Sequence, residues 1–141
     1  MPSVQIPASH RDLLAGPYGA ALATVMPDGS PQATPVWCNL DGDRVLINTM
    51  RGFRKEKNMR ANRKMTLLAF DPKNPLRHVE VRGTVVEMTE DGALDHLDQL
   101  TQLYLHKPDA KFFGDSIPAA LQADYTPVKI TIVPTRVRVE G

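Results

Sequence analysis

Strong turn signals stand at regular intervals between short apolar segments of this sequence, and they narrow the choice of folds more than any other pattern. They occur at 27–30 (PDGS), 41–43 (DGD) and 72–75 (PKNP). Six segments are predicted as strands: 18–26, 32–40, 44–49, 64–71, 77–88 and 128–140. Turns that recur about every 8 to 12 residues favour an antiparallel barrel, closed or nearly closed, over a parallel sheet.

Two predicted strands carry additional information. In 77–88, the apolar residues Val79, Val81 and Val85 share one side with Gly83, while polar residues alternate with them. The strand 32–40 is interrupted by Pro35. Because proline cannot donate to a strand ladder, that point is an edge, a bulge, or a place where the backbone faces a ligand.

Helices are expected at three places. The segment 9–16 is predicted as a short helix, and 53–61 as another, because it lacks strand alternation. A longer helix is expected after Thr89, which would cap it, with acidic residues at 90–91 in its first turn. Its apolar stripe is Ala93, Leu97, Leu100 and Tyr104. The segment 106–127 is expected to be a loop with one helical turn.

The composition suits one domain, residues 1–141, with flanking helices around a mainly β core. Hydrophobic residues make up 42% of the 141, which is enough for a single core. The single cysteine, Cys38, excludes an intrachain disulfide and a cysteine-rich zinc site. Because no apolar run has the length of a signal peptide or a membrane span, the expected location is the cytoplasm.

Positive charge is concentrated between residues 51 and 64. Seven basic residues stand there with one acid, Glu56, although the whole chain has 17 Lys+Arg and 16 Asp+Glu. The segment runs from a strand end into a helix, whose N-terminus offers free N–H groups and the positive end of its dipole. It therefore suits a phosphate or a polycarboxylate; the alternative is an ordinary solvated helix face. Nucleic acid is less favoured, since Phe53 is the only aromatic side chain available for stacking there.

Two further segments contain candidate site residues, but neither forms a self-sufficient catalytic motif. Trp37 follows Pro35, so it could lie against a flat heterocycle or could be an ordinary core residue. Arg77 and His78 begin a strand, and the histidines of the chain show no metal-ligand spacing. No catalytic residue is identified and no metal is expected. If the protein is an enzyme, the difficult chemistry belongs to a bound cofactor.

Three segments taken in order resemble a known family. They are DGSPQATPVW, then VLINTMRGFRKEKNMRANRKMTLLAFDPKNP, then RHVEVRGTV. Their order and spacing are similar to those of the split β-barrel flavin/deazaflavin oxidoreductases, the superfamily related to pyridoxamine 5'-phosphate oxidase. The likeness covers about residues 10 to 140 and is strongest to the actinobacterial branch that uses coenzyme F420. The end of the chain, PTRVRVEG, lacks the histidine that true pyridoxamine phosphate oxidases use for their substrate.

The resemblance implies a six-stranded antiparallel split β-barrel of the FMN-binding type, forming a homodimer with cofactors at its interface. The cofactor would be F420, or alternatively FMN. The implied cofactor-binding residues are Gln32, Pro35, Val36 and Trp37 for the ring system, Arg51, Arg54, Lys55, Lys57 and Asn58 for the acidic tail, Asn48, Thr49 and Met50 along the strand end, and Arg77 and His78 from the partner subunit.

The activity implied by the resemblance is hydride transfer from the deazaflavin to a conjugated small molecule. Expected acceptors are a tetrapyrrole such as biliverdin, a quinone or an enone. One alternative is an FMN-dependent oxidase or flavin reductase. The other is non-enzymatic: a cofactor or haem carrier, or a nucleic-acid-binding domain. Neither a membrane nor nucleic acid is an expected partner under the first hypothesis.

Overall fold

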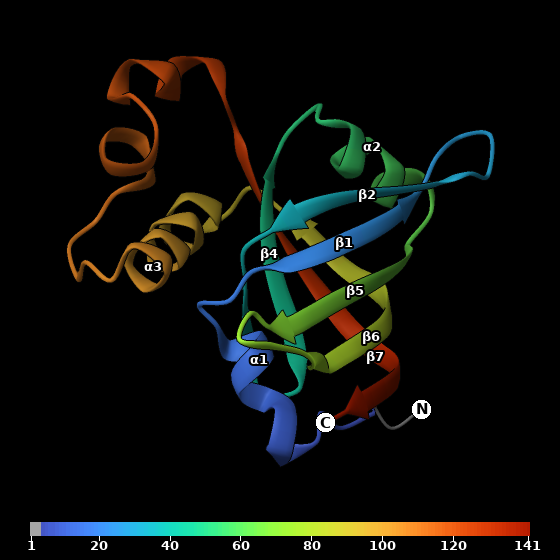
Figure 1. Cartoon of the computed structure of the whole chain (residues 1–141). Coiled ribbons are helices and arrows are strands. Elements are labelled where there is room, and N and C mark those ends of the chain that lie inside the picture. The colour runs from blue at the N-terminus through green and yellow to red at the C-terminus, as the bar shows by residue number, and fades with distance from the viewer. Residues whose placement is uncertain (1–3) are drawn as a thin grey trace.

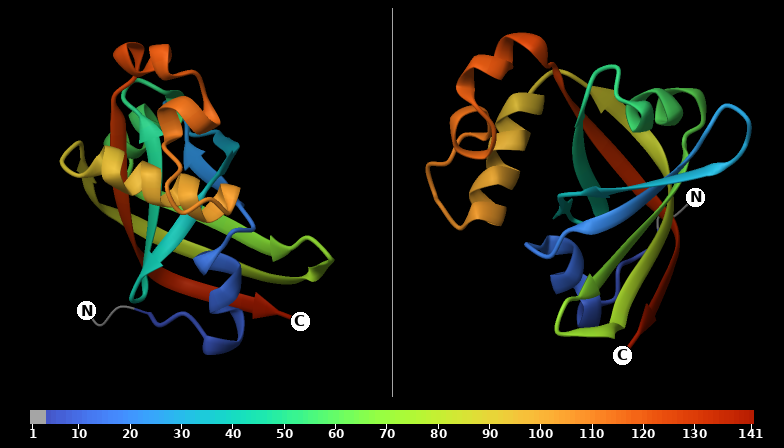
Figure 2. Two further views of the ribbon diagram at one scale, coloured as in Figure 1. Left: turned by 90° about the vertical axis from the view of Figure 1, so that its left-hand side faces the viewer. Right: turned by 45° about the horizontal axis from the view of Figure 1, so that its top comes forward.

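The computed structural model describes residues 4–141 and contains one curled antiparallel sheet with helices around it (Figures 1 and 2). The strands are β1 (Ala20–Val25), β2 (Pro31–Val36), β3 (Cys38–Asp41), β4 (Arg44–Met50), β5 (Lys64–Asp71), β6 (Asn74–Thr89) and β7 (Pro127–Glu140). The helices are α1 (Arg11–Ala15), α2 (Arg54–Ala61) and α3 (Ala93–Leu105), with shorter turns η1 (Ala8–His10), η2 (Phe112–Ser116) and η3 (Ala119–Asp124). Within residues 4–141, none of the helices combines the length and the apolar composition that a membrane-spanning helix requires.

The sheet has seven strands rather than the predicted six, because the predicted strand 32–40 is divided at Trp37. The strand order is β2-β1-β5-β6-β7-β4-β3, so β2 and β3 lie at opposite edges although only Trp37 separates them in sequence. Before Trp37 the chain pairs with β1, and after it with β4. One continuous strand could not pair with both edges, so the ladder breaks where the chain crosses between them. The covalent chain at Trp37 therefore joins the two edge strands, β2 and β3, but no ladder of hydrogen bonds connects them within the described residues.

Pro35 does not break β2, and it pairs in register with Ala21. β2 is an edge strand, the position within a sheet at which proline is tolerated. The structure therefore shows an edge position for this proline and no bulge.

The main core fills the inside of the curled sheet, as the alternation in β6 predicted. Val79, Val81 and Val85 are fully or almost fully buried, and Gly83 lies in the same row. A Cβ added at Gly83 would stand 2.7 Å from Cγ2 of Ile132 and 2.8 Å from the carbonyl oxygen of Val133. Only glycine fits there, because β6 and β7 approach closely next to a bulge at Arg82/Gly83.

The predicted helices form, with shifted boundaries. The helix expected after Thr89 begins at Ala93, so Glu90 and Asp91 precede it, and the Thr89 hydroxyl accepts the N–H of Asp91 instead of capping the helix. Ala93, Leu97 and Leu100 are buried as the stripe predicted. The segment 106–127, expected to be a loop with one helical turn, contains two such turns, η2 and η3, which lie with α3 on one side of the barrel (Figure 1). Met50, Leu97 and Phe113 form a second, smaller hydrophobic cluster there.

A buried polar network fixes α3 to the sheet. The side-chain amide of Asn48 on β4 donates to the carbonyl of Ala93 (2.9 Å) and to Nδ1 of His96 (3.1 Å). The opposite ring nitrogen of His96 donates to Oδ1 of Asn39 at 2.9 Å. This arrangement requires neutral His96 with its proton on Nε2. His96 is only 4% exposed, and this burial, followed by the charge of Lys129, lowers its pKa to about 4.

His96 is therefore expected to make the fold sensitive to mild acid. Unfolded histidine titrates near pH 6.5. The unfolded state therefore binds the proton first, and stability falls as the pH drops from about 6.5 to about 4. The shift corresponds to roughly 2–3 kcal/mol over that range. The His96→Gln variant should lose this decline when its free energy of unfolding is measured by denaturant titration at several pH values. Parallel pH curves for variant and wild type would contradict the assignment.

Candidate functional site

A cavity of about 720 Å³ lies between the two hydrophobic clusters. Its walls come from β1 and β2, the end of β4, the start of α2, and the inner face of α3 with η2. It is lined by Tyr18, Gly19, Ala20, Ala21, Ala33, Thr34, Pro35, Val36, Trp37, Asn48, Thr49, Met50, Phe53, Lys55, Phe70, Leu97, Leu100, Phe112 and Ser116. Most of these side chains are apolar, as in sites for organic ligands, whose volumes are about 300–1,000 Å³.

Trp37 forms an aromatic wall of the cavity, and α3 holds it in place. Its ring stacks on Tyr104 with centroids 5.0 Å apart and planes 16° apart, and the edge of Phe112 completes the contact. The Tyr104 hydroxyl donates to the carbonyl of Cys38 and accepts the N–H of the same residue, both at 2.9 Å. Burial raises the pKa of Tyr104, and it raises that of the Cys38 thiol to about 11. Cys38 is therefore an inert core residue rather than a nucleophile.

Several polar atoms beside the cavity have no partner. Within residues 4–141, buried side-chain oxygens without a hydrogen bond occur on Thr34, Asn48, Thr49 and Asn58. Three of these residues line the cavity, and Thr49 is only 6% exposed. A buried oxygen without a partner costs about 1–3 kcal/mol. A polar ligand in the cavity would relieve part of this cost.

Among residues 4–141, Lys55 is the one basic side chain that lines the cavity. It is half-buried, and this burial lowers its pKa. Among the residues that the structure describes, no carboxylate lies within 4.0 Å of its ammonium group. A desolvated cation without a counter-ion is stabilised by an anionic ligand.

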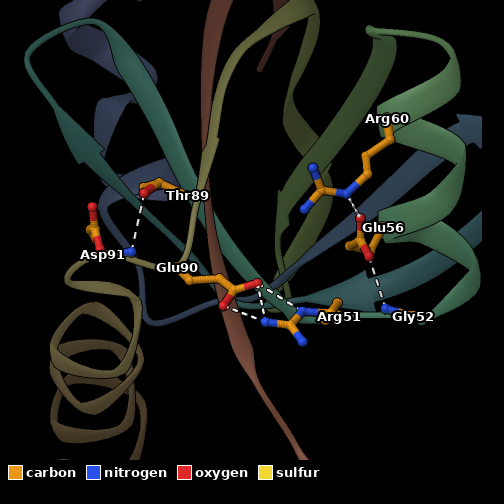
Figure 3. Close-up of polar contacts among 7 residues, drawn as sticks. All are labelled: Arg51, Gly52, Glu56, Arg60, Thr89, Glu90 and Asp91. Atoms are coloured by element: carbon orange, nitrogen blue, oxygen red, sulfur yellow. Dashed lines mark hydrogen bonds and ion pairs between the residues drawn. The ribbon is translucent and has the colours of Figure 1, made fainter.

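Two acidic residues, Glu90 and Glu56, each pair with one arginine of the basic segment (Figure 3). Arg51 makes a bidentate pair with Glu90, at 2.7 Å from its Nε and 2.5 Å from its Nη2. Glu56, which is buried, accepts the N–H of Gly52 at 2.8 Å and pairs with Arg60. Over residues 4–141 the other five basic residues have no ion pair: Arg54, Lys55, Lys57, Arg63 and Lys64.

The structure brings together half of the fourteen residues predicted for the cofactor. Those lining the cavity are Pro35, Val36, Trp37, Asn48, Thr49, Met50 and Lys55. Gln32 and Asn58 do not line the cavity, and the Asn58 amide donates to Oε1 of Gln32 at 3.3 Å and to the Thr24 hydroxyl at 3.0 Å. Arg51, Arg54 and Lys57 are exposed on the adjoining segment.

Arg77 and His78 lie outside the cavity of their own chain. Arg77 pairs with Asp12 at 2.6 Å and donates to the carbonyl of Ser9, and His78 contacts the carbonyl of Leu76. Both lie on β6, which contributes no residue to the cavity lining.

Sequence reasoning missed the wall formed by α3 and η2. Leu97 and Leu100 were predicted only as core, and Phe112 lay in a segment expected to be a loop. The apolar stripe of α3 was the one available signal, but periodicity cannot separate a side chain that packs in a core from one that lines a cavity. In residues 4–141 no three His, Cys, Asp or Glu side chains gather into a metal-binding group.

Comparison with known proteins supplies the family. The pyridoxamine 5'-phosphate oxidase family matches residues 6–126. No curated protein matches the chain. Among solved structures, an F420 reductase is similar at a TM-score of 0.78 and 29% identity, over 94% of this chain and 98% of that one.

Two further structures share the fold. A conserved hypothetical protein from Mycobacterium tuberculosis has a TM-score of 0.75 and 22% identity, over 98% of this chain and 86% of that one. An FAD-binding protein from Mesorhizobium loti has a TM-score of 0.63 and 21% identity, over 97% and 96%. The resemblance seen in the sequence is thereby confirmed: this chain belongs to the pyridoxamine 5'-phosphate oxidase family, with the split-barrel fold.

Proposed function

We propose that this protein is an oxidoreductase that binds the deazaflavin coenzyme F420 in the cavity lined by Trp37 and reduces a conjugated organic molecule. The observation that carries the proposal is the composition of this one cavity. It combines an aromatic wall, oxygens without partners and an uncompensated lysine. The 29% identity to an F420 reductase over almost the full length of both chains supports the choice of cofactor.

The cavity fits a flat heterocycle with polar edges. Trp37 and Phe112 offer apolar surface to a ring face, while Thr34 and Thr49 carry hydroxyls that can donate to ring oxygens. Asn48 commits both amide hydrogens to Ala93 and His96, so it has no donor left for a ligand and offers only its oxygen, as an acceptor. Donors and an acceptor side by side suit the pyrimidine-like edge that flavins and deazaflavins share.

The acidic tail of the cofactor suits the start of α2. The helix begins at Arg54, and Phe53 gives it no side-chain cap. Within residues 4–141 the N–H groups of Arg54, Lys55 and Glu56 have no acceptor, whereas that of Lys57 donates to the carbonyl of Phe53 at 3.0 Å. The side chains of Lys55 and Lys57 add positive charge beside these N–H groups. In the proposed complex, Lys55 holds the tail where the cavity opens onto this helix.

A bound, reduced deazaflavin supplies a hydride. The chain contributes orientation, exclusion of water and electrostatic stabilisation, which can account for much of the reduction in barrier. Leu97, Leu100 and Phe112 form an apolar wall that favours a conjugated, weakly polar acceptor such as a tetrapyrrole, a quinone or an enone.

FMN is the second candidate cofactor. Membership of the pyridoxamine 5'-phosphate oxidase family and the similarity to an FAD-binding protein from Mesorhizobium loti favour a flavin. FMN presents the same heterocycle edge and one phosphate, so the same residues would serve it. The protein would then act as an oxidase or a flavin reductase.

We also propose a homodimer that covers the open side of the cavity. Tyr18 and Phe70 line the cavity yet are 44% and 43% exposed, and Leu68 lies near them on the same outer face of β5 as Phe70. Large apolar side chains exposed together mark an interface. In such a dimer Arg77 and His78 could approach the partner's cofactor.

Direct titration tests the cofactor. Trp37 is the only tryptophan, so a ring bound beside it should quench the intrinsic emission of the protein. We expect F420 to do so with a Kd below about 100 μM, which corresponds to about 5.5 kcal/mol. The Trp37→Phe variant should lose this signal but still bind, as followed by the cofactor's own fluorescence. Failure of both F420 and FMN to bind would refute the proposal, and tighter binding of FMN would select the second candidate.

The Lys55→Met variant tests the tail. Loss of one charged hydrogen bond should weaken F420 binding by about 1.5–3 kcal/mol, that is, roughly ten- to a hundredfold in Kd. The matched control is Lys64→Met, which removes the same charge from an exposed strand residue outside the cavity lining. Equal Kd values for the two variants would place the tail away from Lys55.

The dimer is tested by light scattering coupled to gel filtration. Phe70→Glu should convert dimer to monomer, because a carboxylate would be buried in the proposed interface. Leu105→Glu is the control, since Leu105 is similarly exposed, at 41%, but lies at the end of α3. A wild-type monomer, or a dimer that tolerates the Phe70 change, would exclude this interface.

A further inference from the structure

The pair between Arg51 and Glu90 joins two segments beside the cavity. Arg51 follows the last residue of β4, and Glu90 stands between β6 and α3, as Figure 3 shows. The guanidinium contacts both oxygens of the carboxylate, with two contacts of 2.5 Å and one of 2.7 Å. The cavity-lining residues nearest to Arg51 in the sequence are Met50, which precedes it, and Phe53, two positions after it.

This pair is not needed to hold the fold. The side chains of Arg51 and Glu90 are 57% and 42% exposed, and an ion pair at such exposure contributes little to stability. Other contacts already hold the two segments that carry Arg51 and Glu90. The N–H of Arg51 donates to the carbonyl of Thr126 at 2.8 Å, and α3 is held by the buried network of Asn48 and His96.

Glu56 provides a contrast within the same segment. It is 2% exposed, it accepts the N–H of Gly52, and its partner is Arg60 on the same helix (Figure 3). Removing Arg60 from it would leave a buried carboxylate uncompensated, which is strongly unfavourable. Arg60 is therefore committed to the protein, whereas Arg51 can exchange its partner at low cost.

A guanidinium fork binds phosphate and carboxylate with the same bidentate geometry. We propose that Glu90 is a built-in competitor for Arg51, which exchanges this carboxylate for the anionic group of the bound cofactor. The inference rests on the proposed function, since it assumes an acidic tail at the start of α2. Glu90 would thereby weaken the binding of acidic ligands while leaving ligands without the acidic group unaffected.

The experiment compares each cofactor with its counterpart lacking the acidic tail. F420 is paired with its free deazaflavin chromophore, and FMN with riboflavin. Wild type, Glu90→Gln, Arg51→Gln and the double variant are titrated at low salt. Glu90→Gln should tighten binding of the acidic member about two- to fivefold and leave the tail-less member unchanged. The double variant should lose this gain.

Glu87→Gln controls for net charge. Glu87 is an exposed glutamate on the same strand end, and no ion pair involves it within the described residues. If Glu87→Gln tightened binding of the acidic cofactor as much as Glu90→Gln does, the effect would come from net charge alone, and the inference would be overturned. Weaker binding of both ligand forms in Glu90→Gln would mean that the pair only ties the two segments together, and would overturn it as well.

Inorganic pyrophosphate separates this inference from the proposed function. If neither cofactor binds, the proposed function fails, and thermal shift with pyrophosphate then decides the inference. Stabilisation that is larger in Glu90→Gln than in wild type, and lost in the double variant, supports exchange at Arg51. Equal shifts in all four proteins overturn it.

Discussion

The architecture of this protein depends on a single crossing of the chain, at Trp37, from one edge of the sheet to the other. A residue at that point cannot join either ladder, so the backbone beside it needs other partners. The Tyr104 hydroxyl supplies both of them for Cys38, and its ring stacks on the Trp37 side chain. The residue that satisfies the backbone beside the crossing therefore also fixes an aromatic wall of the cavity.

The cavity exists because the molecule has two hydrophobic clusters rather than one. The larger cluster fills the curled sheet, and the smaller one lies between α3, η2 and the end of β4. Asn48 and His96 hold α3 against the sheet with directional hydrogen bonds, which fix the position of the helix without filling the space between the clusters. Apolar side chains alone would have favoured collapse of that space, because burial of their surface is not directional.

Burial divides the basic segment into residues with different roles. Glu56 is buried and commits Arg60 to the protein, while Lys55 is half-buried beside the cavity and has no counter-ion in the part of the chain that the structure describes. Arg51 is intermediate between Arg60 and Lys55, because it has an ion-pair partner but is exposed to solvent. The same residue types within 14 positions of sequence thus range from a fixed structural pair to a cation available for a ligand.

The sequence by itself determined most strands, their turns, the core side of β6 and the region of positive charge. Each of these depends on local preference or on a period within one element, such as the alternation through Val79 and Val81. The three ordered motifs also identified the family, because their spacing reflects the whole fold. Of the candidate site, the sequence indicated the residues of β2 and of the end of β4, together with Lys55.

Only the tertiary structure decided the rest. The break at Trp37 follows from a strand order that no local pattern encodes, and the wall of Leu97, Leu100 and Phe112 follows from where α3 packs. The pairing of Arg51 with Glu90 joins residues 39 positions apart. The physical reason is the same in each case: a contact between distant segments depends on how complete elements pack against one another, and propensity and periodicity describe single elements.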